Sequence, residues 1–359
     1  MRIERFKFQR RLRSPARIAG ILAISGLLTI STVTDARAQN QGAGLKPFGF
    51  SNGSTVYTMS DADLGREMDG IRSVGGSWIR LEISWQKVEP VQGQRNWAPI
   101  DRLVNAASAR GLAILGLPTY APAWATNPQA NAWTLGSPRN PDEFGNFAAA
   151  AATRYGNRIS TWEIWNEPNL AYFHNPSPTG KSYLPTLKAA YTAIKAVQPQ
   201  STVIAAGLAN SADWAFGSSP FTFVRALYSN GGKPFFDGLA LHPYPAGVTP
   251  PAGVYWAQIS QVYALMNYHG DGGKKIWITE FGVPTQTNGA SEAKQSEIVL
   301  AGLREAGKLP YVAGVFIHTF RNTGTNAGDA EANFGLVRRD FSPKLAFDNI
   351  RAAAGLSVG

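Results

Sequence analysis

Two glutamates in this sequence stand at the ends of apolar, strand-like segments. Glu167 lies in an Asn-Glu-Pro motif after the run "STWEIW", and Glu280 lies near the end of "KIWITEF". Hydrolysis of a glycosidic bond needs two opposed carboxyl groups, because one protonates the leaving oxygen while the other attacks the anomeric carbon or activates water. Asn-Glu-Pro alone also occurs in ordinary loops, where its glutamate caps a helix or forms an ion pair. The chemistry therefore depends on whether the fold brings Glu280 to Glu167.

The two segments belong to a regular alternation of strand-like and helix-like patterns. The strand-like segments are short, nearly continuously apolar and rich in branched or aromatic residues, as is typical of strands buried on both faces of a parallel sheet. They are residues 47–52, 77–83, 112–118, 159–166, 201–209, 236–242, 275–281 and 311–320. Between them, apolar residues recur at helical spacing, in the ranges 60–71, 100–107, 141–151, 184–194 and 298–303.

Eight strands that alternate with helices predict an α/β fold, and the number eight favours a closed, single-domain (β/α)8 TIM barrel. A doubly wound open sheet is the alternative. The first strand-like segment is not followed by a glycine-rich phosphate loop, which weakens that alternative.

In a (β/α)8 barrel the active site lies at the carboxyl ends of the strands. Glu167 and Glu280 would end the fourth and seventh strands, so they can face each other across the mouth of the barrel. Arg80 and Tyr244 could keep one of them ionised by charge and hydrogen bonding. The residues that we expect to bind substrate at this end are Asn166, Arg80, His242, Tyr244, Tyr120, Trp124, Trp85, Trp165, Phe320 and His318.

The aromatic members of this set have a second interpretation, since rings at a barrel rim also simply pack in the core. Tyr120 and Trp124 fall in a strand-to-helix loop, which favours a sugar platform. Trp165 lies inside a strand, and we expect it to pack with one edge in the site. Glu163, four residues before Glu167, should point into the barrel interior as a structural partner for an arginine.

Several segments together resemble one group of enzymes. The segments "SWIRLEISWQKVEPVQGQRNW", "LVNAASARGLAILGLPTYAPAWA", "WEIWNEPNL" and "NFGLVRRDFSPKLAF", with the glutamate that closes "KIWITE", resemble clan A glycoside hydrolases. These are retaining (β/α)8 glycosidases, and the likeness is to bacterial members near families 39 and 5, some of which act on exopolysaccharides. The resemblance covers residues 47–350, and its two glutamate motifs together are highly specific.

The resemblance implies roles for the candidate residues. Glu167 matches the acid/base and Glu280 the nucleophile, while Asn166 matches a residue that binds the sugar hydroxyl beside the reacting carbon. Arg80 and Tyr244 match groups that hold the nucleophile, and His242 matches a residue that binds substrate or supports one that does. Retention implies carboxyl groups about 5 Å apart and a covalent glycosyl-enzyme intermediate.

The sequence departs from this family pattern at two places. The last strand carries "IHTFRN" where a tryptophan platform is usual, and "AYFHN" follows Asn-Glu-Pro where an aromatic pair, usually Phe-Trp, is expected. Both departures concern the groups that recognise the sugar. The sugar and its linkage are therefore left open by the sequence.

The composition argues against metal or thiol chemistry. The four histidines, at positions 174, 242, 269 and 318, show no metal-ligand spacing, and the chain has no cysteine. We therefore expect no metal and no organic cofactor. Without disulfides, stability must come from the hydrophobic core.

The N-terminus has the pattern of a secretory signal peptide. Seven basic residues within 2–17 precede an apolar run from Ile18 to about Val33, and Ala36 and Ala38 fit a cleavage site. An uncleaved membrane anchor is the alternative, but the run is shorter than the ~20 residues of a spanning helix. We predict a signal peptide over 1–38, a flexible lead over 39–46 and a catalytic domain over 47–355. The mature protein would be exported, to the periplasm or out of the cell.

Most of the positive charge belongs to the predicted signal peptide. The chain has a formal net charge of +10, and removal of residues 1–38 leaves 26 basic and 22 acidic residues. This ordinary balance gives no indication of a nucleic-acid partner. We expect a carbohydrate substrate, no stable membrane anchoring and a monomer.

The sequence thus predicts a retaining glycosidase that cleaves β-linked polysaccharides or oligosaccharides. Because no accessory domain is evident, endo action is favoured, with an exo-acting β-xylosidase-like enzyme as the alternative. A carbohydrate-binding barrel without turnover is a rival of another class, although such a barrel tends to lose one glutamate. A metal-dependent hydrolase on the same fold would need clustered histidines and aspartates at the strand ends, and the sequence lacks them.

Overall fold

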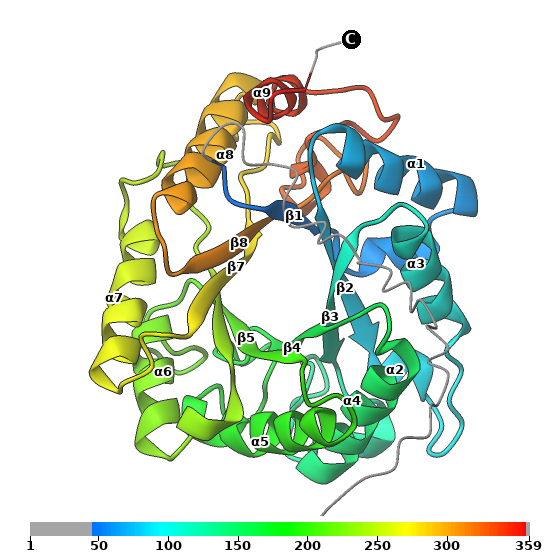
Figure 1. Ribbon diagram of the computed structural model, residues 1–359, viewed down its shortest axis with the longest axis vertical. Helices are drawn as coiled ribbons and strands as arrows, with labels where there is room; N and C mark the ends of the chain where they lie inside the picture. The colour runs from blue at the N-terminus through cyan, green and yellow to red at the C-terminus, as the bar shows by residue number, and fades with distance from the viewer. Residues whose placement is uncertain (1–44, 357–359) are drawn as a thin grey trace, which may run out of the picture. The chain divides into compact units, whose positions relative to one another are not determined.

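The computed structural model describes residues 45–356, so the predicted signal peptide and most of the predicted lead lie outside the described residues. Eight parallel strands form a closed barrel in chain order, with β1 beside β8 (Figure 1). The closed sheet confirms the predicted (β/α)8 fold and excludes the doubly wound alternative. The strands are β1 (Phe48–Ser51), β2 (Trp78–Ser84), β3 (Ala113–Thr119), β4 (Thr161–Asn166), β5 (Thr202–Ala209), β6 (Gly238–His242), β7 (Lys275–Phe281) and β8 (Val312–Ile317).

Helices surround the barrel, as Figure 1 shows. The α-helices are α1 (Asp61–Ser73), α2 (Trp85–Val88), α3 (Ala98–Ser108), α4 (Pro141–Tyr155), α5 (Gly180–Val197), α6 (Pro220–Ser229), α7 (Val254–Tyr268), α8 (Glu292–Gly307) and α9 (Leu345–Ala353). Short 3-10 helices are η2 (Gly53–Thr58), η3 (Ala123–Ala125), η4 (Lys233–Phe235) and η5 (Glu331–Asn333). In the described part of the chain, no helix combines the length and apolar character needed to cross a bilayer.

Local sequence explains how the predicted helices begin. The side chain of Ser60 accepts a hydrogen bond from Asp63 N at 3.1 Å, which caps α1. Pro141 is the first residue of α4, where its missing N–H has no helical partner to lose. The sequence does not predict α6, α7 or α9. In α7 the apolar residues Val254 and Tyr268 are exposed, so apolar side chains occur on both faces and the helical periodicity is weak.

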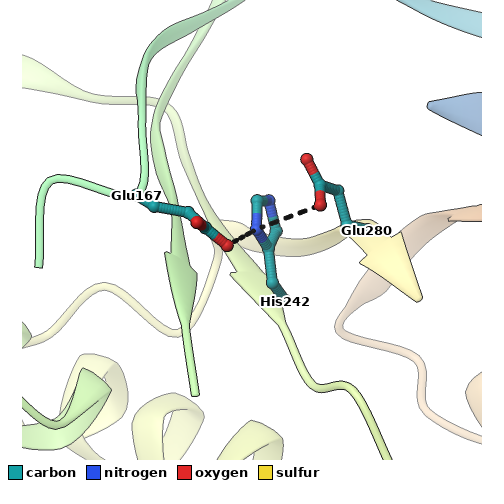
Figure 2. A group of neighbouring side chains, drawn as sticks. All are labelled: Glu167, His242 and Glu280. Atoms are coloured by element: carbon teal, nitrogen blue, oxygen red, sulfur yellow. Dashed lines mark hydrogen bonds and ion pairs between the residues drawn. The ribbon is translucent and has the colours of Figure 1, made fainter. Parts of the chain in front are cut away.

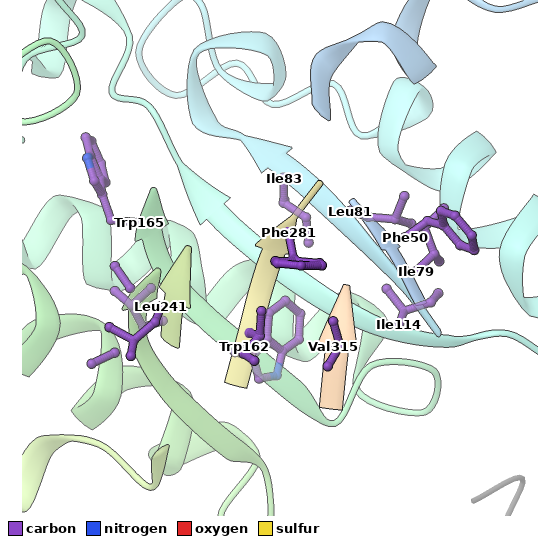
Figure 3. Packing of buried hydrophobic residues seen from close by; sticks show 14 of the residues in the cluster. Phe50, Ile79, Leu81, Ile83, Ile114, Trp162, Trp165, Leu241, Phe281 and Val315 are labelled. Atoms are coloured by element: carbon purple, nitrogen blue, oxygen red, sulfur yellow. The ribbon is translucent and has the colours of Figure 1, made fainter. Parts of the chain in front are cut away.

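Alternation along β2 decides which side chains enter the barrel. Ile79, Leu81 and Ile83 belong to the main core cluster (Figure 3). Arg80 and Glu82, on the other face, point into the barrel. The bottom of the interior is filled by a separate cluster formed by Trp78, Leu115, Ile204, Ala240 and Phe316. The polar residues near the carboxyl ends of the strands therefore lie above an apolar layer inside the barrel.

Candidate active site

A cavity of about 740 Å³ opens at the carboxyl ends of the strands. Asn166 and Glu167 line it from the end of β4, Tyr244 from the loop after β6, and Glu280 from β7. Residues far apart in the sequence thus meet at one edge of the sheet because parallel strands end there together.

Irregular backbone at the ends of β4 and β7 turns the two glutamates inward. Glu163 points into the barrel, so strict alternation would place Trp165 inside and Asn166 outside. Trp165 instead has φ of 72° and packs in the main core (Figure 3), while Asn166 faces inward to Arg80. In β7 the pairing with β8 shifts between Ile278 and Phe281, so that Thr279 and Glu280 both face the interior.

Glu280 is held at both carboxylate oxygens. Arg80 Nη1 donates to Oε1 at 2.6 Å, and the Tyr244 hydroxyl donates to Oε2 at 2.7 Å. Burial acts to raise the pKa of Glu280, but His242, Arg80, His318 and the Tyr244 hydrogen bond lower it to about 2. Glu280 is therefore ionised across the whole range in which enzymes normally work.

Arg80 is itself fixed by a second carboxylate. Its Nε and Nη2 donate to Glu163 at 2.8 and 3.0 Å, and Nη2 also donates to Asn166 Oδ1 at 2.9 Å. A buried guanidinium needs such pairing, because an uncompensated buried charge costs several kcal/mol. The bond to Oδ1 also sets the Asn166 amide, so that its NH₂ group is free to donate to a ligand in the cavity.

His242 connects the two catalytic candidates. Its Nδ1 lies 2.8 Å from Oε1 of Glu167 and 3.7 Å from Oε2 of Glu280, and the ring stands between the two carboxyl groups in Figure 2. The nearest oxygens of the two glutamates lie within 4.8 Å of each other. This short separation suits a retaining glycosidase, because an inverting one needs about 6.5–9.5 Å to admit a water molecule.

A chain of hydrogen bonds fixes which atom of His242 carries a proton. The Thr279 hydroxyl donates to Glu163 Oε1 at 3.1 Å, so its oxygen accepts from His242 Nε2 at 3.0 Å. The 2.8 Å contact between His242 Nδ1 and Glu167 Oε1 then requires one proton between these atoms. The pair therefore stores one proton, on the acid or on the ring, beside the place where a leaving group would receive it.

The trio of Glu167, His242 and Glu280 could also be considered as a cation site, since their ligand atoms converge. Both oxygens of Glu280 are already taken by Arg80 and Tyr244, and the positive guanidinium is only 2.6 Å away. This charge disfavours a divalent cation at the same place. The residues present fit a shared proton better than a metal.

Tyr120 and His318 line the cavity. Burial raises the pKa of Tyr120, with a further contribution from Glu82. His318 Nδ1 lies 3.0 Å from the carbonyl oxygen of Ser51. Burial disfavours the charged form of His318, but Glu331 and Glu280 outweigh it and raise the pKa of the imidazole.

Four aromatic residues predicted to bind substrate lie elsewhere. Trp85, Trp165 and Phe320 are enclosed by other side chains, with at most 1% of each residue exposed. Trp124 packs edge-on against Trp85 and donates to the carbonyl of Glu89. None of the four lines the cavity, and the rings of Trp85, Trp165 and Phe320 are too enclosed to offer a face to a sugar. The error has a physical cause, because a strand-end aromatic reaches the cavity only if the local backbone turns it inward.

The cavity also contains residues that the sequence does not predict. Tyr172 and Phe173 supply an aromatic pair in the "AYFHN" segment, and Phe334 packs against Tyr244 and His318 on the side of β8. Glu82 also lines the cavity. A polar residue two positions after Arg80 in an apolar strand is the signal that could have found it.

A closed (β/α)8 barrel with two carboxyl groups facing each other at its carboxyl end has the arrangement that cleavage of a glycosidic bond requires. The model of the family "Cellulase (glycosyl hydrolase family 5)" matches residues 39–312. The chain therefore belongs to glycosyl hydrolase family 5.

The chain is similar to a xylanase and to solved structures of family 39 glycoside hydrolases. A stretch of 134 residues is 26% identical to "Endo-1,4-beta-xylanase 1" of Gibberella zeae, covering 36% of this chain and 35% of the xylanase. A family 39 glycoside hydrolase from the gut symbiont Bacteroides cellulosilyticus WH2 is 28% identical, with a TM-score of 0.70 over 87% of this chain and 64% of that chain. A GH39 beta-xylosidase from Caulobacter crescentus shares the fold at 18% identity, with a TM-score of 0.67 over 89% and 74% of the two chains.

Proposed function

We propose that the protein is a retaining endo-glycosidase of β-linked polysaccharides, with Glu280 as nucleophile and Glu167 as acid/base. The single observation that carries the retaining assignment is the separation of the two carboxyl groups, whose nearest oxygens lie within 4.8 Å. Their different partners support the division of roles. Glu280 is bound by a guanidinium and a phenol, whereas Glu167 shares a proton with His242.

In the first step, Glu280 attacks the anomeric carbon while Glu167 gives its proton to the glycosidic oxygen. The bond between that carbon and the leaving oxygen breaks, and a glycosyl ester of Glu280 forms. Arg80 and Tyr244 hold the attacking carboxylate in place. The Asn166 amide, oriented by Arg80, is available to donate to the sugar hydroxyl beside the reacting carbon.

In the second step, Glu167 takes a proton from a water molecule that attacks the same carbon. The ester bond breaks, Glu280 returns as a carboxylate, and the sugar leaves with its original configuration. His242 Nδ1 lies 2.8 Å from Glu167, so a proton that Glu167 takes from water can be shared with the imidazole.

Exposed aromatic residues beyond the cavity support endo action. Tyr172 lines the cavity and is 49% exposed, and its ring lies 6.5 Å from that of Trp133, which is 62% exposed. Leu135 N donates to Tyr172 O, which joins the two loops that carry these rings. Exposed aromatic patches of this kind mark binding surfaces. Trp133 lies in the segment between β3 and α4, and Tyr172 lies in the segment between β4 and α5, five residues after Glu167.

We propose β-1,4-xylan as the first polymer to test, because the curated relative is named as an endo-1,4-beta-xylanase and a structural neighbour as a beta-xylosidase. The proposal includes export directed by residues 1–38, which would place the enzyme where such polymers occur.

The test is hydrolysis by residues 39–359 of xylan, β-glucans and bacterial exopolysaccharides, followed by reducing ends and product lengths. We expect a ladder of oligosaccharides from the wild type, retention of anomeric configuration by NMR, and loss of activity in Glu280→Gln. Release of monosaccharide alone would establish the exo-acting alternative. Binding of a polymer with no hydrolysis would instead establish a carbohydrate-binding barrel.

A further inference from the structure

Glu82 is a third carboxylate in the cavity, and the mechanism above does not use it. It lies on β2, two residues after Arg80, and therefore faces the same side of the sheet one layer closer to the mouth. Only 8% of the residue is exposed, and its side chain lines the cavity.

The side chain of Glu82 has no hydrogen-bond partner among residues 45–356. Its backbone carbonyl accepts from the Tyr57 hydroxyl at 2.6 Å, which anchors the strand at this point. The other carboxylates near the cavity floor are all paired: Glu163 and Glu280 with Arg80, and Glu167 with His242. The carboxyl group of Glu82 faces the open cavity, where a bound ligand can satisfy its oxygens in place of solvent.

The surroundings of Glu82 are built for a polar ligand. Gln86 and Lys87 line the same wall from α2, and Tyr120 lines it from the loop after β3. Burial raises the pKa of Glu82 to about 7, although Lys87 and Arg80 act in the opposite direction. The carboxyl group can therefore donate or accept a hydrogen bond near neutral pH.

We propose that Glu82 is a substrate-binding residue whose carboxyl group hydrogen-bonds one hydroxyl group of a sugar ring bound in the cavity. Its function is to select sugars that carry this hydroxyl in the correct orientation. A site with a buried polar group rejects an analogue that lacks the matching group, because the polar group is then left unpaired. This inference rests on the proposed function and adds a specificity determinant to it.

The test compares wild type, Glu82→Ala and Glu82→Gln on the polymer that the wild type cleaves and on aryl β-xylobiosides that each lack one hydroxyl. We expect Glu82→Ala to lower kcat/KM by about tenfold to hundredfold. Glu82→Gln has the same shape and still donates and accepts, so it should stay within about threefold of the wild type. For one deoxy substrate, the wild type should show a kcat/KM lower than that for the parent substrate by the same factor as Glu82→Ala lowers kcat/KM for the parent. For that deoxy substrate, Glu82→Ala should have the same kcat/KM as the wild type.

The matched control is Glu67→Gln, another buried glutamate, which does not line the cavity. It should leave kcat/KM unchanged. If Glu82→Ala does not fold, as judged by circular dichroism, Glu82→Leu takes its place, because leucine fills similar space and cannot form a hydrogen bond. The inference would be overturned if kcat/KM fell by the same factor for every deoxy substrate with all variants. It would also be overturned if Glu82→Ala had the kcat/KM of the wild type.

A second measurement separates this inference from the proposed function. Binding of xylotetraose is measured by calorimetry in Glu280→Gln and in the double variant Glu82→Ala/Glu280→Gln. If the wild type cleaves no substrate, the proposed function fails. A weaker Kd in the double variant by about tenfold or more would still support Glu82 as a ligand-binding residue, and an equal Kd would overturn that role.

Discussion

A Cβ atom on Gly207 would lie only 2.0 Å from Nε2 of His242. The imidazole thus occupies the space that a side chain at position 207 would need. Gly207 also donates from its N–H to Glu163 and accepts from the N–H of Glu167. One glycine on β5 therefore gives room to the histidine and links the buried carboxylate of Glu163 to the backbone of the proposed acid, Glu167.

Gly207→Ala should abolish most activity without unfolding the protein. The added methyl group displaces His242 and moves the proton shared with Glu167, and a displacement of about 1 Å at an active site can cost on the order of 100-fold in rate. The measurement is kcat on the preferred polymer together with the thermal transition. Gly273→Ala is the matched control, since a Cβ there meets no atom within 4 Å. Wild-type kcat in Gly207→Ala would contradict the prediction.

Thr279→Val should lower kcat more than it changes KM. The valine has nearly the same shape, but it removes the acceptor of His242 Nε2 and the donor to Glu163. The imidazole then loses the contact that fixes its proton, and we expect a drop of roughly tenfold to hundredfold. Thr279→Ser keeps the hydroxyl and should stay near the wild type. Equal activity of the valine and serine variants would show that the hydrogen bond has no role.

Much of the fold could be predicted because parallel strands buried on both faces are apolar throughout, and eight such runs stand out. The meeting of Glu167 and Glu280 at one end of the barrel could be predicted because these two residues interrupt apolar runs at their ends. Helix α7 could not, because Val254 and Tyr268 are apolar yet exposed. Tertiary packing, which the pattern does not contain, decides which of two apolar faces is covered.

The positions of the aromatic residues around the cavity were harder to predict than those of the carboxylates. Trp165 follows an alternation that would place it inside the barrel, and its positive φ turns it outward. A tryptophan has no intrinsic preference for that backbone region, so nothing in the sequence indicates the reversal. Tyr172 and Trp133 owe their exposed positions to loop paths, which depend on contacts between segments distant in the chain.

Tyr244→Phe should move the acidic limb of kcat/KM to higher pH. Glu280 must be ionised to attack, and its pKa of about 2 depends partly on the hydrogen bond from Tyr244. Without that bond the protonated form is favoured, so the pKa rises and activity is lost earlier as pH falls, by about one pH unit. The measurement is kcat/KM from pH 2.5 to 7 with a stability check at each value. Tyr263→Phe, which loses a hydroxyl bond to Gly272 O outside the cavity, should leave the limb in place.

Trp133→Ala should impair cleavage of long chains and spare short ones. The exposed ring is not part of the cavity lining and lies next to Tyr172, so we expect only a substrate that extends out of the cavity to contact it. An aromatic contact of about 0.5–1.5 kcal/mol corresponds to a loss of roughly twofold to tenfold in kcat/KM on hexasaccharides. Tyr268→Ala, an exposed ring at the end of α7, is the control. An equal loss on disaccharide glycosides would contradict a polymer-binding role.

Glu67→Gln should change how stability depends on pH. Burial raises the pKa of Glu67 to about 8, with partial opposition from Arg321 and Arg339, whereas the ordinary value is 4.5. Between these values the folded protein keeps a proton that the unfolded chain has lost, so the free energy of unfolding falls as pH rises. Below pH 4.5 both states are protonated and the full stability is present. Glutamine has no proton to lose, so its variant should lack this slope.

The wild type should therefore be more stable than Glu67→Gln at low pH and less stable than it at high pH. At pH 4 the glutamine places a buried NH₂ group where Glu67 Oε2 has no hydrogen-bond partner, so the variant should be less stable by about 1–3 kcal/mol. At pH 9 the wild type must ionise Glu67, a residue that is only 1% exposed. The wild type should then be the less stable protein, by a similar free energy of unfolding. Urea unfolding of both proteins at pH 4, 6, 8 and 9 measures the difference. A constant difference at all four values would show that Glu67 ionises equally in the folded and unfolded chains.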